Sequence, residues 1–550
     1  MMCDAGQDRT VRVRVLDIHR SVLEDESVLA EDNFYDMGGD SLLSLQVLGR
    51  IERELGVKVP PRAFFTAESI AQVADLVADL VADLVAGPAG DPVASGADGA
   101  DRGAPRPAGQ DTGRASMAQE WAFLSSLRDP QAPILQFHAV FRVSGPFDTQ
   151  RLEAALNRVA ERHGSLRTGF TEADGTARQS VEPEARADLA VIDRRGVAEA
   201  EVDEYLREFV RRPFDRSRAP LWRTLVVRRA DAEVLLVFVF DHMIADGWSL
   251  DTFVEDLSAA YRGAELPLRD GQSGAYADWA AGQWKAWEGG RAEELADYWR
   301  SQLSADPAEF ALRLPGYRGT EGLSKPASLV RDLDPASARA LRTACQDLRA
   351  TPYCVSMSAV KAVVALATGR QRVTLLTTNA NRLDGAYQST VGWFANGVFP
   401  TTDVDLSGTF RDLVSAVRAS ILGATAHGDM PAMFVRRRIW PELPAGFRKD
   451  PGVYFMYNDV WGGGLGFGED VTVATHHLTE DADSPGLHMW LLREGEGLRL
   501  QALHYESEYA PEYVEGFADS VVRALDLLAA QPDRPMSDLL DPREFAALRG

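Results

Sequence analysis

His242 and Asp246 are a histidine and an aspartate four residues apart, and their types and spacing make them the leading candidates for catalysis in this sequence. They lie in 240–249 (FDHMIADGWS), after the apolar run 234–240 and before the amphipathic segment 250–261. This pattern predicts a buried strand, a turn that carries the histidine, and a helix. A short loop between two rigid elements can hold an imidazole for proton transfer near neutral pH. Many such pairs are purely structural, so the rest of the chain has to decide.

Ser41 is the second candidate for chemistry. It follows Gly38-Gly39-Asp40 and stands at the start of an apolar-periodic segment that predicts a helix. A serine in this place can be a plain helix N-cap. Residues 39–42 also spell the signature of a family of serine esterases. In that family a buried strand precedes the signature, whereas acidic residues 31–33 precede it here, and no matching Asp-x-x-His follows near the C-terminus.

The bulk composition limits the classes of function. A chain of 550 residues is expected to form about three compact units. Its formal net charge of −24 argues against nucleic acid as a partner, because phosphates bind clusters of Lys and Arg. Cys3, Cys345 and Cys354 do not suggest a disulfide framework or a metal knuckle. No apolar run reaches transmembrane length and the N-terminus lacks an apolar signal core, so we expect a cytoplasmic protein with no membrane partner.

The N-terminal region is expected to be a small helical module. Residues 51–55 and the repeat of Asp-Leu-Val-Ala over 75–86 favour helices. Val11, Val13 and Val15 alternate with arginine, which by itself predicts a strand. The Gly/Ala/Pro/Asp-rich stretch 87–115 predicts a flexible linker with an end-to-end distance of roughly 30 Å.

From Ser116 onward, helical and strand patterns alternate, which indicates an α/β or α+β fold. Helices are predicted over 150–163, over 409–422 and from Pro511 onward. Strands are predicted over 138–143, 234–240, 373–378, 453–456 and 487–492. A Trp/Tyr-rich stretch, 276–299, divides two halves of comparable size.

The N-terminal module resembles the carrier proteins of nonribosomal peptide synthetases. The resemblance rests on DNFYDMGGDSLLSLQVLGRIERELG (32–56) and PPRAFFTAESIAQVADLV (60–77). It implies a four-helix bundle, so a helix replaces the strand expected at 11–15. It also implies that Ser41 carries a covalent 4′-phosphopantetheine arm, which a phosphopantetheinyl transferase attaches.

The remainder, from 116 to 545, resembles the condensation domains of the same synthetases. The matching stretches follow one another in family order: 116–124, 162–170, 240–249, 298–300, 381–382, 391–396 and 426–431. The resemblance implies two lobes, each folded like chloramphenicol acetyltransferase, that meet along a tunnel. Carrier-bound donor and acceptor arms would enter this tunnel from opposite ends.

The resemblance also assigns roles to single residues. His242 is the functional histidine of the active-site motif, Asp246 its structural acid and Gly247 its close-approach glycine, whose N–H could serve an oxyanion. We expect Arg382 to be the ion-pair partner of Asp246. The sequence departs from the family at Asp241, where the motif has its first histidine.

The predicted organisation is an all-α four-helix carrier bundle (8–86), a flexible linker (87–115) and an α/β two-lobed condensation domain with lobes at 116–290 and 291–550. The predicted reaction is transfer of an acyl or aminoacyl group from the thioester on Ser41 to an amine, which forms an amide bond. No adenylation domain is present, so a separate adenylation protein or an upstream synthetase would load Ser41. The acceptor would be another carrier protein or a small amine.

Three alternatives stay open. Epimerization domains share the fold and the histidine motif, but residues 377–382 (TTNANR) lack the glutamate of that family. Ester formation with a hydroxyl acceptor is a variant of the leading prediction. A docking platform without catalysis is the third, and Asp241 is its main support. The sequence shows no metal site and no phosphate-binding glycine loop.

Overall fold

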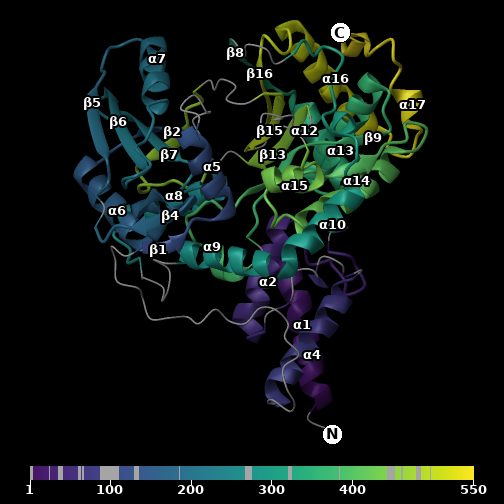
Figure 1. Ribbon diagram of the computed structural model, residues 1–550, viewed down its shortest axis with the longest axis horizontal. Helices are drawn as coiled ribbons and strands as arrows, with labels where there is room; N and C mark the ends of the chain where they lie inside the picture. Colours follow the sequence, from purple (N-terminus) through teal and green to yellow (C-terminus); the bar gives the residue numbers. More distant parts are fainter. Residues whose placement is uncertain are drawn as a thin grey trace.

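The protein is described here from a computed structural model, which comprises a small helical unit beneath two larger α/β lobes (Figure 1). The described residues are 4–23, 25–34, 37, 41–57, 59, 63–64, 67, 69–86, 111–128, 136–184, 186–266, 275–319, 325–382, 384–442, 452–459, 462–478, 485–495 and 497–549.

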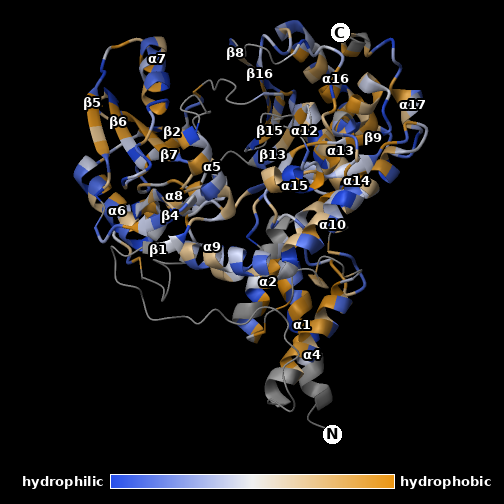
Figure 2. Cartoon of the chain, in the orientation of Figure 1, coloured by the Kyte–Doolittle hydropathy of each residue, from blue (hydrophilic) through white to orange (hydrophobic). Residues whose placement is uncertain are grey.

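Three helices make up the described elements of the N-terminal unit: α1 (Asp4–Leu23), α2 (Ser41–Leu55) and α4 (Ile70–Ala86). Val11, Val15, Ile18 and Val22 recur every three or four residues on α1 and are buried in the core of the unit. The helix at 11–15 is therefore confirmed, and the strand that the alternation alone predicts is wrong. Figure 2 shows hydrophobic and hydrophilic residues side by side along α1 and α4. The fourth helix of the predicted bundle falls outside the described elements.

The core of this unit contains a buried histidine, His19. It is fully inaccessible, its Nδ1 lies 2.7 Å from the carbonyl oxygen of Val15, and its ring packs against Phe34 and Phe64. Burial lowers the pKa of His19 to about 4. An unfolded chain takes up this proton near pH 6.5, so between pH 6.5 and pH 4 the unfolded state binds more protons than the folded state.

We therefore expect the N-terminal unit to lose about 3 kcal/mol of folding free energy as the pH falls from 7 to 4. Urea unfolding followed by amide NMR signals of α1 measures this loss in the full chain. The variant His19→Leu is the control, because it has no proton to take up at this position. A loss that is equally steep in the variant would contradict the assignment to His19.

The first lobe is built on a five-stranded sheet in the order β14-β2-β7-β6-β5. Its strands are β2 (Gln136–Ser144), β5 (Leu189–Asp193), β6 (Trp222–Ala230), β7 (Glu233–Asp241) and β14 (Thr472–Thr475). Its helices are α5 (Met117–Arg128), α6 (Thr149–Arg162), α7 (Glu199–Val210) and α8 (Gly247–Tyr261), with η1 at Gly164–Arg167. Alternate residues of β7 enter two separate clusters, one shared with α6 and α8 and the other with α7. Burial on both faces explains the continuous apolar run of this strand.

A small sheet, β1-β4-β3, completes this lobe. Its strands are β1 (Asp111–Arg114), β3 (Thr168–Ala173) and β4 (Thr176–Val181). β1 lies inside the stretch predicted as a flexible linker, so at 111–114 that prediction is wrong. The pairing of Arg114 with Arg178, and a bond from Ala115 N to the carbonyl of Ala177, hold this segment in place.

A bent helical segment joins the two lobes. It consists of α9 (Ala275–Ala286), η2 (Trp287–Arg291) and α10 (Ala292–Gln302). Gly290, with φ at +104°, makes the bend, a conformation that favours glycine. α9 contacts α5 and β1, whereas α10 contacts α15 (Ala432–Ile439) of the second lobe. The Trp/Tyr-rich stretch thus forms the connection between the halves.

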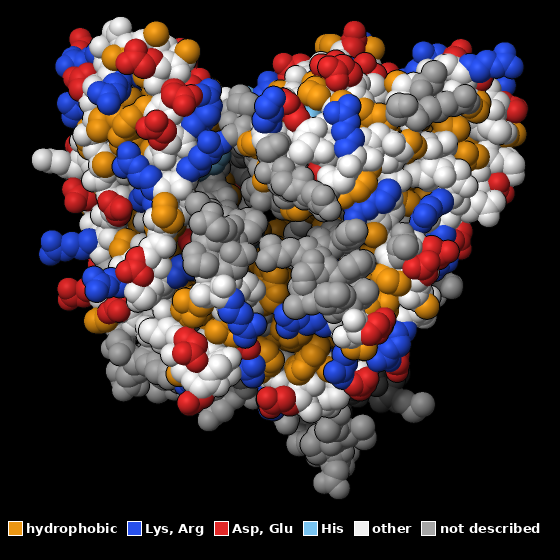
Figure 3. Space-filling view, turned by 45° about the horizontal axis from the view of Figure 1, so that its top comes forward, with side chains coloured by type: hydrophobic (Ala, Val, Ile, Leu, Met, Phe, Trp, Pro, Cys, Tyr) orange, Lys and Arg blue, Asp and Glu red, His pale blue; other side chains and the backbone are white. Residues whose placement is uncertain are grey.

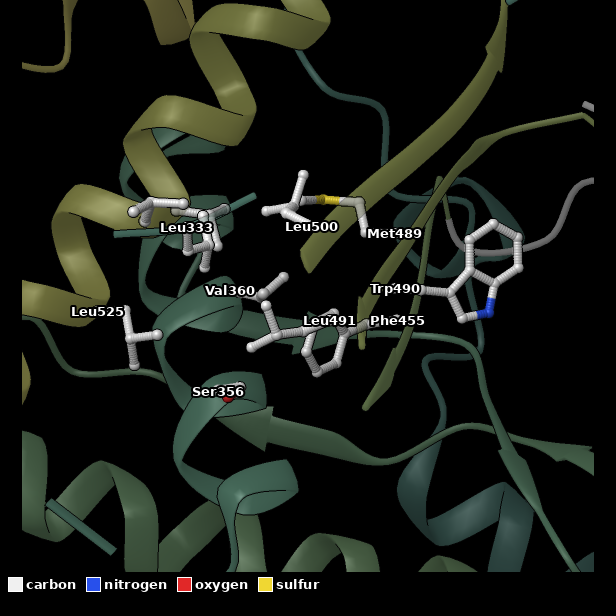
Figure 4. Close-up of a pocket in the computed structure, with 11 residues that line it drawn as sticks. Leu333, Ser356, Val360, Phe455, Met489, Trp490, Leu491, Leu500 and Leu525 are labelled. Atoms are coloured by element: carbon white, nitrogen blue, oxygen red, sulfur yellow. The ribbon is translucent and has the colours of Figure 1, made fainter. Parts of the chain in front are cut away.

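The second lobe has a four-stranded sheet in the order β13-β15-β16-β8. Its strands are β8 (Pro326–Asp332), β13 (Val453–Asp459), β15 (Leu487–Glu494) and β16 (Gly497–Tyr505). The helices are α11 (Pro307–Phe310), α12 (Pro335–Leu348), α13 (Pro352–Thr368), α14 (Phe410–Ala426), α16 (Pro511–Ala530), α17 (Met536–Leu539), η3 (Gly385–Tyr387) and η4 (Ala546–Arg549). Apolar side chains of the sheet and of α13 and α16 meet around a small cavity, while the Trp490 ring points away from it (Figure 4).

One predicted strand, 373–378, divides into two. β9 (Arg372–Thr374) pairs with β12 (Thr401–Asp403), and β10 (Thr377–Asn379) pairs with β11 (Asn396–Val398). The other predicted helices and strands of both lobes are confirmed within a few residues of their ends. Among the described helices none is by itself long and apolar enough to cross a membrane; the bent pair α12 and α13 passes that test on length and composition together.

Candidate active site

His242 lies just after the end of β7, on the turn that leads to α8. The turn is closed by a bond from Ile244 N to the carbonyl of Asp241. Gln119 of α5, part of the first matched stretch, donates from Nε2 to the carbonyl of Met243 at 2.6 Å. The turn carrying the histidine is therefore fixed from both the strand and a neighbouring helix. Figure 3 shows the molecular surface notched between the two lobes.

Asp246 caps the start of α8 and is 1% exposed. Its Oδ1 accepts from the backbone N and the Oγ of Ser249, at 2.9 and 2.7 Å. Its Oδ2 accepts from the backbone N–H groups of Phe394 and Ala395, at 3.0 and 3.1 Å. These last two residues come from the second half of the chain, so one carboxylate ties the turn to a segment almost 150 residues away.

Arg382 is the ion-pair partner of Asp246, as the sequence predicts. Its Nη2 donates to Asp246 Oδ1 at 3.0 Å, and both side chains are almost fully buried. Its Nη1 donates to the carbonyls of Tyr387 and Thr390, at 2.8 and 2.6 Å. Burial alone would raise the pKa of the Asp246 carboxyl, but the Arg382 guanidinium and Ser249 hold that pKa below its usual value. Asp246 is therefore an ionised structural residue whose oxygens are occupied by these donors.

Two aromatic side chains border the His242 ring. The Trp393 ring centroid lies 4.7 Å from that of His242 and the Phe137 centroid 5.5 Å, the latter edge-on. The carbonyl of Trp393 accepts from the hydroxyl of Tyr276 at 2.6 Å, which fixes the tryptophan in turn. These contacts restrict the imidazole by packing. Trp393 lies in 391–396, one of the stretches that resemble the family. Its distance from His242 along the sequence does not predict that the two rings are in contact.

Only glycine fits at position 392, where this segment packs against Tyr276 and Ser249. A Cβ at this residue would lie 2.1 Å from the ring of Tyr276. The backbone of Gly392 also donates to, and accepts from, Ser249 Oγ. Only a residue without a side chain brings the neighbouring amides of 394–395 within reach of Asp246.

Asp241, the residue at which the sequence departs from the family motif, is buried and bound by two donors. It is 1% exposed; its Oδ1 accepts from Met243 N at 2.9 Å and its Oδ2 from Arg216 Nε at 2.8 Å. The carboxylate thus caps the turn that carries His242 and is neutralised by an arginine that the sequence analysis did not identify. No sequence spacing links Arg216 to this turn. The aspartate at this position is thus accommodated by a charge pair and by a backbone hydrogen bond.

The Asp241–Arg216 pair is expected to be worth more than a surface ion pair, because its members are only 2% and 14% exposed. We expect Asp241→Asn to lower the free energy of unfolding by about 2 kcal/mol. We expect Arg216→Gln together with Asp241→Asn to cost less than the sum of the two single changes. Urea unfolding of all four proteins, followed by tryptophan fluorescence, measures the coupling. Strict additivity would show that the two side chains act independently.

Ser41 is the first residue of α2, and residues 38–40 and the Ser41 side chain lie outside the described part of the structure. The start of a helix suits a phosphodiester, because its N–H groups and its dipole favour negative charge. The residues at this place therefore fit a phosphopantetheine attached to Ser41. Within the described residues, no three His, Cys, Asp or Glu side chains are grouped to hold a metal ion.

Three of the other histidines have structural partners. His163 lies 2.7 Å from Asp256, and His427 stacks on Tyr298 with ring centroids 3.6 Å apart. His476 follows β14 and is bound to Asp203 of α7 at 2.9 Å. Gly247 is the first residue of α8, directly after its cap Asp246. The structure thus brings together His242, Asp246, Gly247 and Arg382, which lie in two distant stretches of the sequence.

Comparison with known protein families supports both parts of the chain. The family model described as "Condensation domain" matches residues 110–444, and that described as "Phosphopantetheine attachment site" matches residues 13–77. The two models match in the order that the sequence motifs predict.

Curated relatives match over most of this chain but are themselves much longer. Surfactin synthase subunit 2 of Bacillus subtilis (strain 168) is 28% identical over 529 residues, which is 95% of this chain and 14% of that relative. One of the linear gramicidin synthase subunits of Brevibacillus parabrevis is 29% identical over 436 residues, which is 76% of this chain and 5% of that relative. The chain therefore spans only a small part of the length of these two relatives.

Solved structures share the fold. The condensation domain from the Monacolin K polyketide synthase MokA has a TM-score of 0.66 at 20% identity, with 77% of this chain and 98% of that chain covered. The first condensation domain of the calcium-dependent antibiotic synthetase, in complex with a substrate analogue, has a TM-score of 0.64 at 20% identity, with 78% and 99% covered. The two-lobed architecture expected from the sequence is confirmed.

Proposed function

The chain belongs to the condensation-domain family, with a phosphopantetheine-attachment domain in front, the carrier-then-condensation order of nonribosomal peptide synthetases; on this premise we propose that it transfers an acyl or aminoacyl group from Ser41 to an amine. The phosphopantetheine thiol supplies the thioester that activates the acyl group. The boundaries proposed for its parts are 8–86 for the carrier and 116–290 and 291–550 for the two lobes. The product is an amide.

The placement of His242 carries this proposal. The residue stands on a turn that is anchored by Gln119, by the Asp241 cap and by Asp246, and its ring is confined by Trp393 and Phe137. Aminolysis of a thioester needs an oriented nucleophile, management of one proton and stabilisation of an oxyanion. His242 would accept or position the proton of the attacking amine, and the N–H of Gly247 would face the oxyanion. Asp246 holds the turn and takes no proton.

We infer the partners from the two kinds of domain. A phosphopantetheinyl transferase attaches the arm to Ser41, and an adenylation domain or an upstream synthetase module supplies the acyl group. The acceptor is a second carrier protein or a small amine, and the setting is the cytoplasm.

The test loads Ser41 with acyl groups from a panel of acyl-coenzyme A thioesters through a phosphopantetheinyl transferase. Aminoacyl N-acetylcysteamine thioesters are then offered as acceptors, and the acyl group is followed by intact-protein mass and by product analysis. We expect acyl loss from Ser41 with equal formation of amide, and no loading of Ser41→Ala. Deuterium uptake from heavy water into the bound group without transfer would support epimerization instead. Products formed only with hydroxyl acceptors would support ester formation.

A further inference from the structure

Arg216 has unused hydrogen-bond donors next to the turn that carries His242. Its Nε donates to Asp241 Oδ2 at 2.8 Å. Among the described residues its Nη1 and Nη2 have no hydrogen-bond partner, and neither of these two atoms is buried. A guanidinium carries five N–H donors, so four of them are open to a molecule from outside the chain.

The geometry of the pair explains why these donors are left over. Arginine and a carboxylate often form two parallel hydrogen bonds. Here the two oxygens of Asp241 bind different donors, because Oδ1 accepts from Met243 N at 2.9 Å and Oδ2 accepts from Arg216 Nε. Asp241 is 1% exposed and bound to the turn, so it holds the guanidinium by one edge in a fixed position. The pair therefore presents its remaining donors in a preorganised arrangement.

The position of Arg216 is within reach of a small substrate at His242. Asp241 precedes His242 in the chain and binds Arg216, so the guanidinium lies on the order of 10 Å from the imidazole. The side chain of Arg216 is 14% exposed, so its charge is screened less by salt than that of a surface arginine. A substrate whose reacting group lies at His242 can therefore place a second group against Arg216.

The local charge favours an anion as that second group. Residues 211–218 contain four arginines and one aspartate, in a chain whose net charge is −24. The aspartate, Asp215, lies 3.9 Å from Arg218. Among the described residues Arg216 forms its one ion pair with Asp241. A carboxylate is planar and accepts two parallel hydrogen bonds, so it fits the open edge of this guanidinium.

We propose that Arg216 is a specificity-determining residue that binds a carboxylate on the amine acceptor or on the acyl group. This inference rests on the proposed function and deepens it by naming the substrate class, either an amino acid with a free carboxylate or a dicarboxylic acyl group. Asp241 is the residue at which the sequence departs from the family motif, and it anchors the arginine.

The first experiment tests the acceptor. Acyl-loaded full chain is offered glycine, β-alanine and γ-aminobutyrate, each against its own carboxamide, and kcat/KM is measured for amide formation. The ratio of carboxylate to carboxamide is then compared between proteins, so that differences in amine basicity cancel. We expect this ratio, for the best pair, to be about tenfold lower in the double variant Arg216→Gln/Asp241→Asn than in the wild type.

The second experiment tests the acyl group. Ser41 is loaded with adipyl or hexanoyl groups, which have the same chain length, and ethylamine is the acceptor. The experiment in which the double variant lowers the preference for the carboxylate identifies the substrate that carries it. An unchanged ratio in both experiments would overturn the proposal. A loss of transfer that is uniform across all substrates, as expected if Arg216 bound the phosphate of the arm, also leaves the ratios unchanged and would overturn it.

Two variants separate binding of a substrate from support of the turn. Asp241→Asn keeps Arg216 and removes its competing carboxylate, so we expect the preference for the carboxylate to be equal or larger. A purely structural pair predicts that Asp241→Asn lowers the preference as much as the double variant does, and that result would contradict the proposal. Arg218→Gln is the matched control for charge, since Arg218 lies in the same segment and its side chain is 84% exposed. Its ratios should equal those of the wild type.

A binding measurement distinguishes failure of this inference from failure of the proposed function. Saturation-transfer NMR is recorded with γ-aminobutyrate, adipate and their amides on the full chain. We expect stronger saturation of at least one carboxylate in the wild type than in the double variant, with urea unfolding as the check that both proteins are folded. Equal saturation in the two proteins would overturn the carboxylate site. Absence of transfer from every substrate in the wild type would refute the proposed function, while the NMR comparison would still decide the role of Arg216.

Discussion

His242→Ala is expected to slow acyl transfer from Ser41 to an amine by about 10²–10⁴-fold. The imidazole is the side chain on the turn best suited to handle the proton of the amine, since the oxygens of Asp246 are bound to Arg382, Ser249 and two backbone amides and those of Asp241 to Arg216 and Met243 N. Its ring packs between Phe137 and Trp393, and alanine removes the imidazole while the backbone bonds of the turn remain. Intact-protein mass, taken at intervals after addition of an aminoacyl thioester, measures the rate.

A second histidine variant serves as the control for this experiment. His477 is an exposed histidine bound to Glu494, and His477→Ala should transfer at the wild-type rate. Urea unfolding checks that His242→Ala is folded under the assay conditions; we expect a loss of about 1 kcal/mol in its free energy of unfolding, because the contacts of the ring with Phe137 and Trp393 are removed. Undiminished transfer in a folded His242→Ala protein would remove the histidine from the reaction and favour a docking platform.

Arg382→Met is expected to lower the free energy of unfolding by about 3–5 kcal/mol. The arginine and Asp246 are each 1% exposed, so the change leaves a carboxylate in the interior without its counter-charge. The same change removes the donors to Tyr387 and Thr390 and so loosens η3. Urea unfolding followed by the fluorescence of Trp248 and Trp393, which lie beside this network, measures the loss.

The loss of stability in Arg382→Met is expected to become smaller as the pH falls. In the wild type the pKa of Asp246 is below its usual value, so its contribution to stability is present above about pH 4 and is lost as the pH falls further. In Arg382→Met, burial without a counter-charge raises that pKa, so the variant regains stability as the pH falls from 7 to 4. The difference in stability between the two proteins should therefore shrink over this range. A difference that stays constant would show that Asp246 is not the group responsible.

Arg300→Met is the matched control for this substitution. Arg300 forms an ion pair with Asp297 on α10, and both side chains are largely exposed. An exposed pair is worth about 0–1 kcal/mol, so the control should unfold close to the wild type at every pH. A loss in the control as large as that in Arg382→Met would mean that removal of any arginine, and not of this buried one, is what destabilises the protein.

The sequence by itself predicted most of the elements and the residues of the candidate site. The run 234–240 predicts a strand, because β7 is buried on both faces and therefore apolar without interruption. Apolar residues that recur every three to four positions predict three helices. These are α6, α14 and α16, expected at 150–163, at 409–422 and from 511 onward. Ordered motifs on both sides of His242 predicted the two-lobed fold and the pairing of Asp246 with Arg382.

Local pattern failed where the partner of a residue lies far along the chain. Val11–Val15 alternate like a strand, but packing against α2 and α4 makes them a helix. Residues 111–114 are polar and Gly-containing like a linker, and only pairing with β4 makes them a strand. Residues 373–378 read as one strand, yet β11 and β12 pair with different parts of it. In each case tertiary contacts decide between conformations that local propensity leaves close in energy.

The tertiary structure alone decided what surrounds the turn that carries His242. Arg216 neutralises Asp241, Trp393 packs on His242, and Leu422 packs against the carrier. None of these contacts has a fixed spacing in sequence, because each joins two elements through the way the lobes and domains pack. Residue types and local periodicity predict that β7 ends near residue 240 and that His242 lies on the turn after it. They do not predict which charged and aromatic side chains pack against that turn, because those contacts form between elements that are far apart in the sequence.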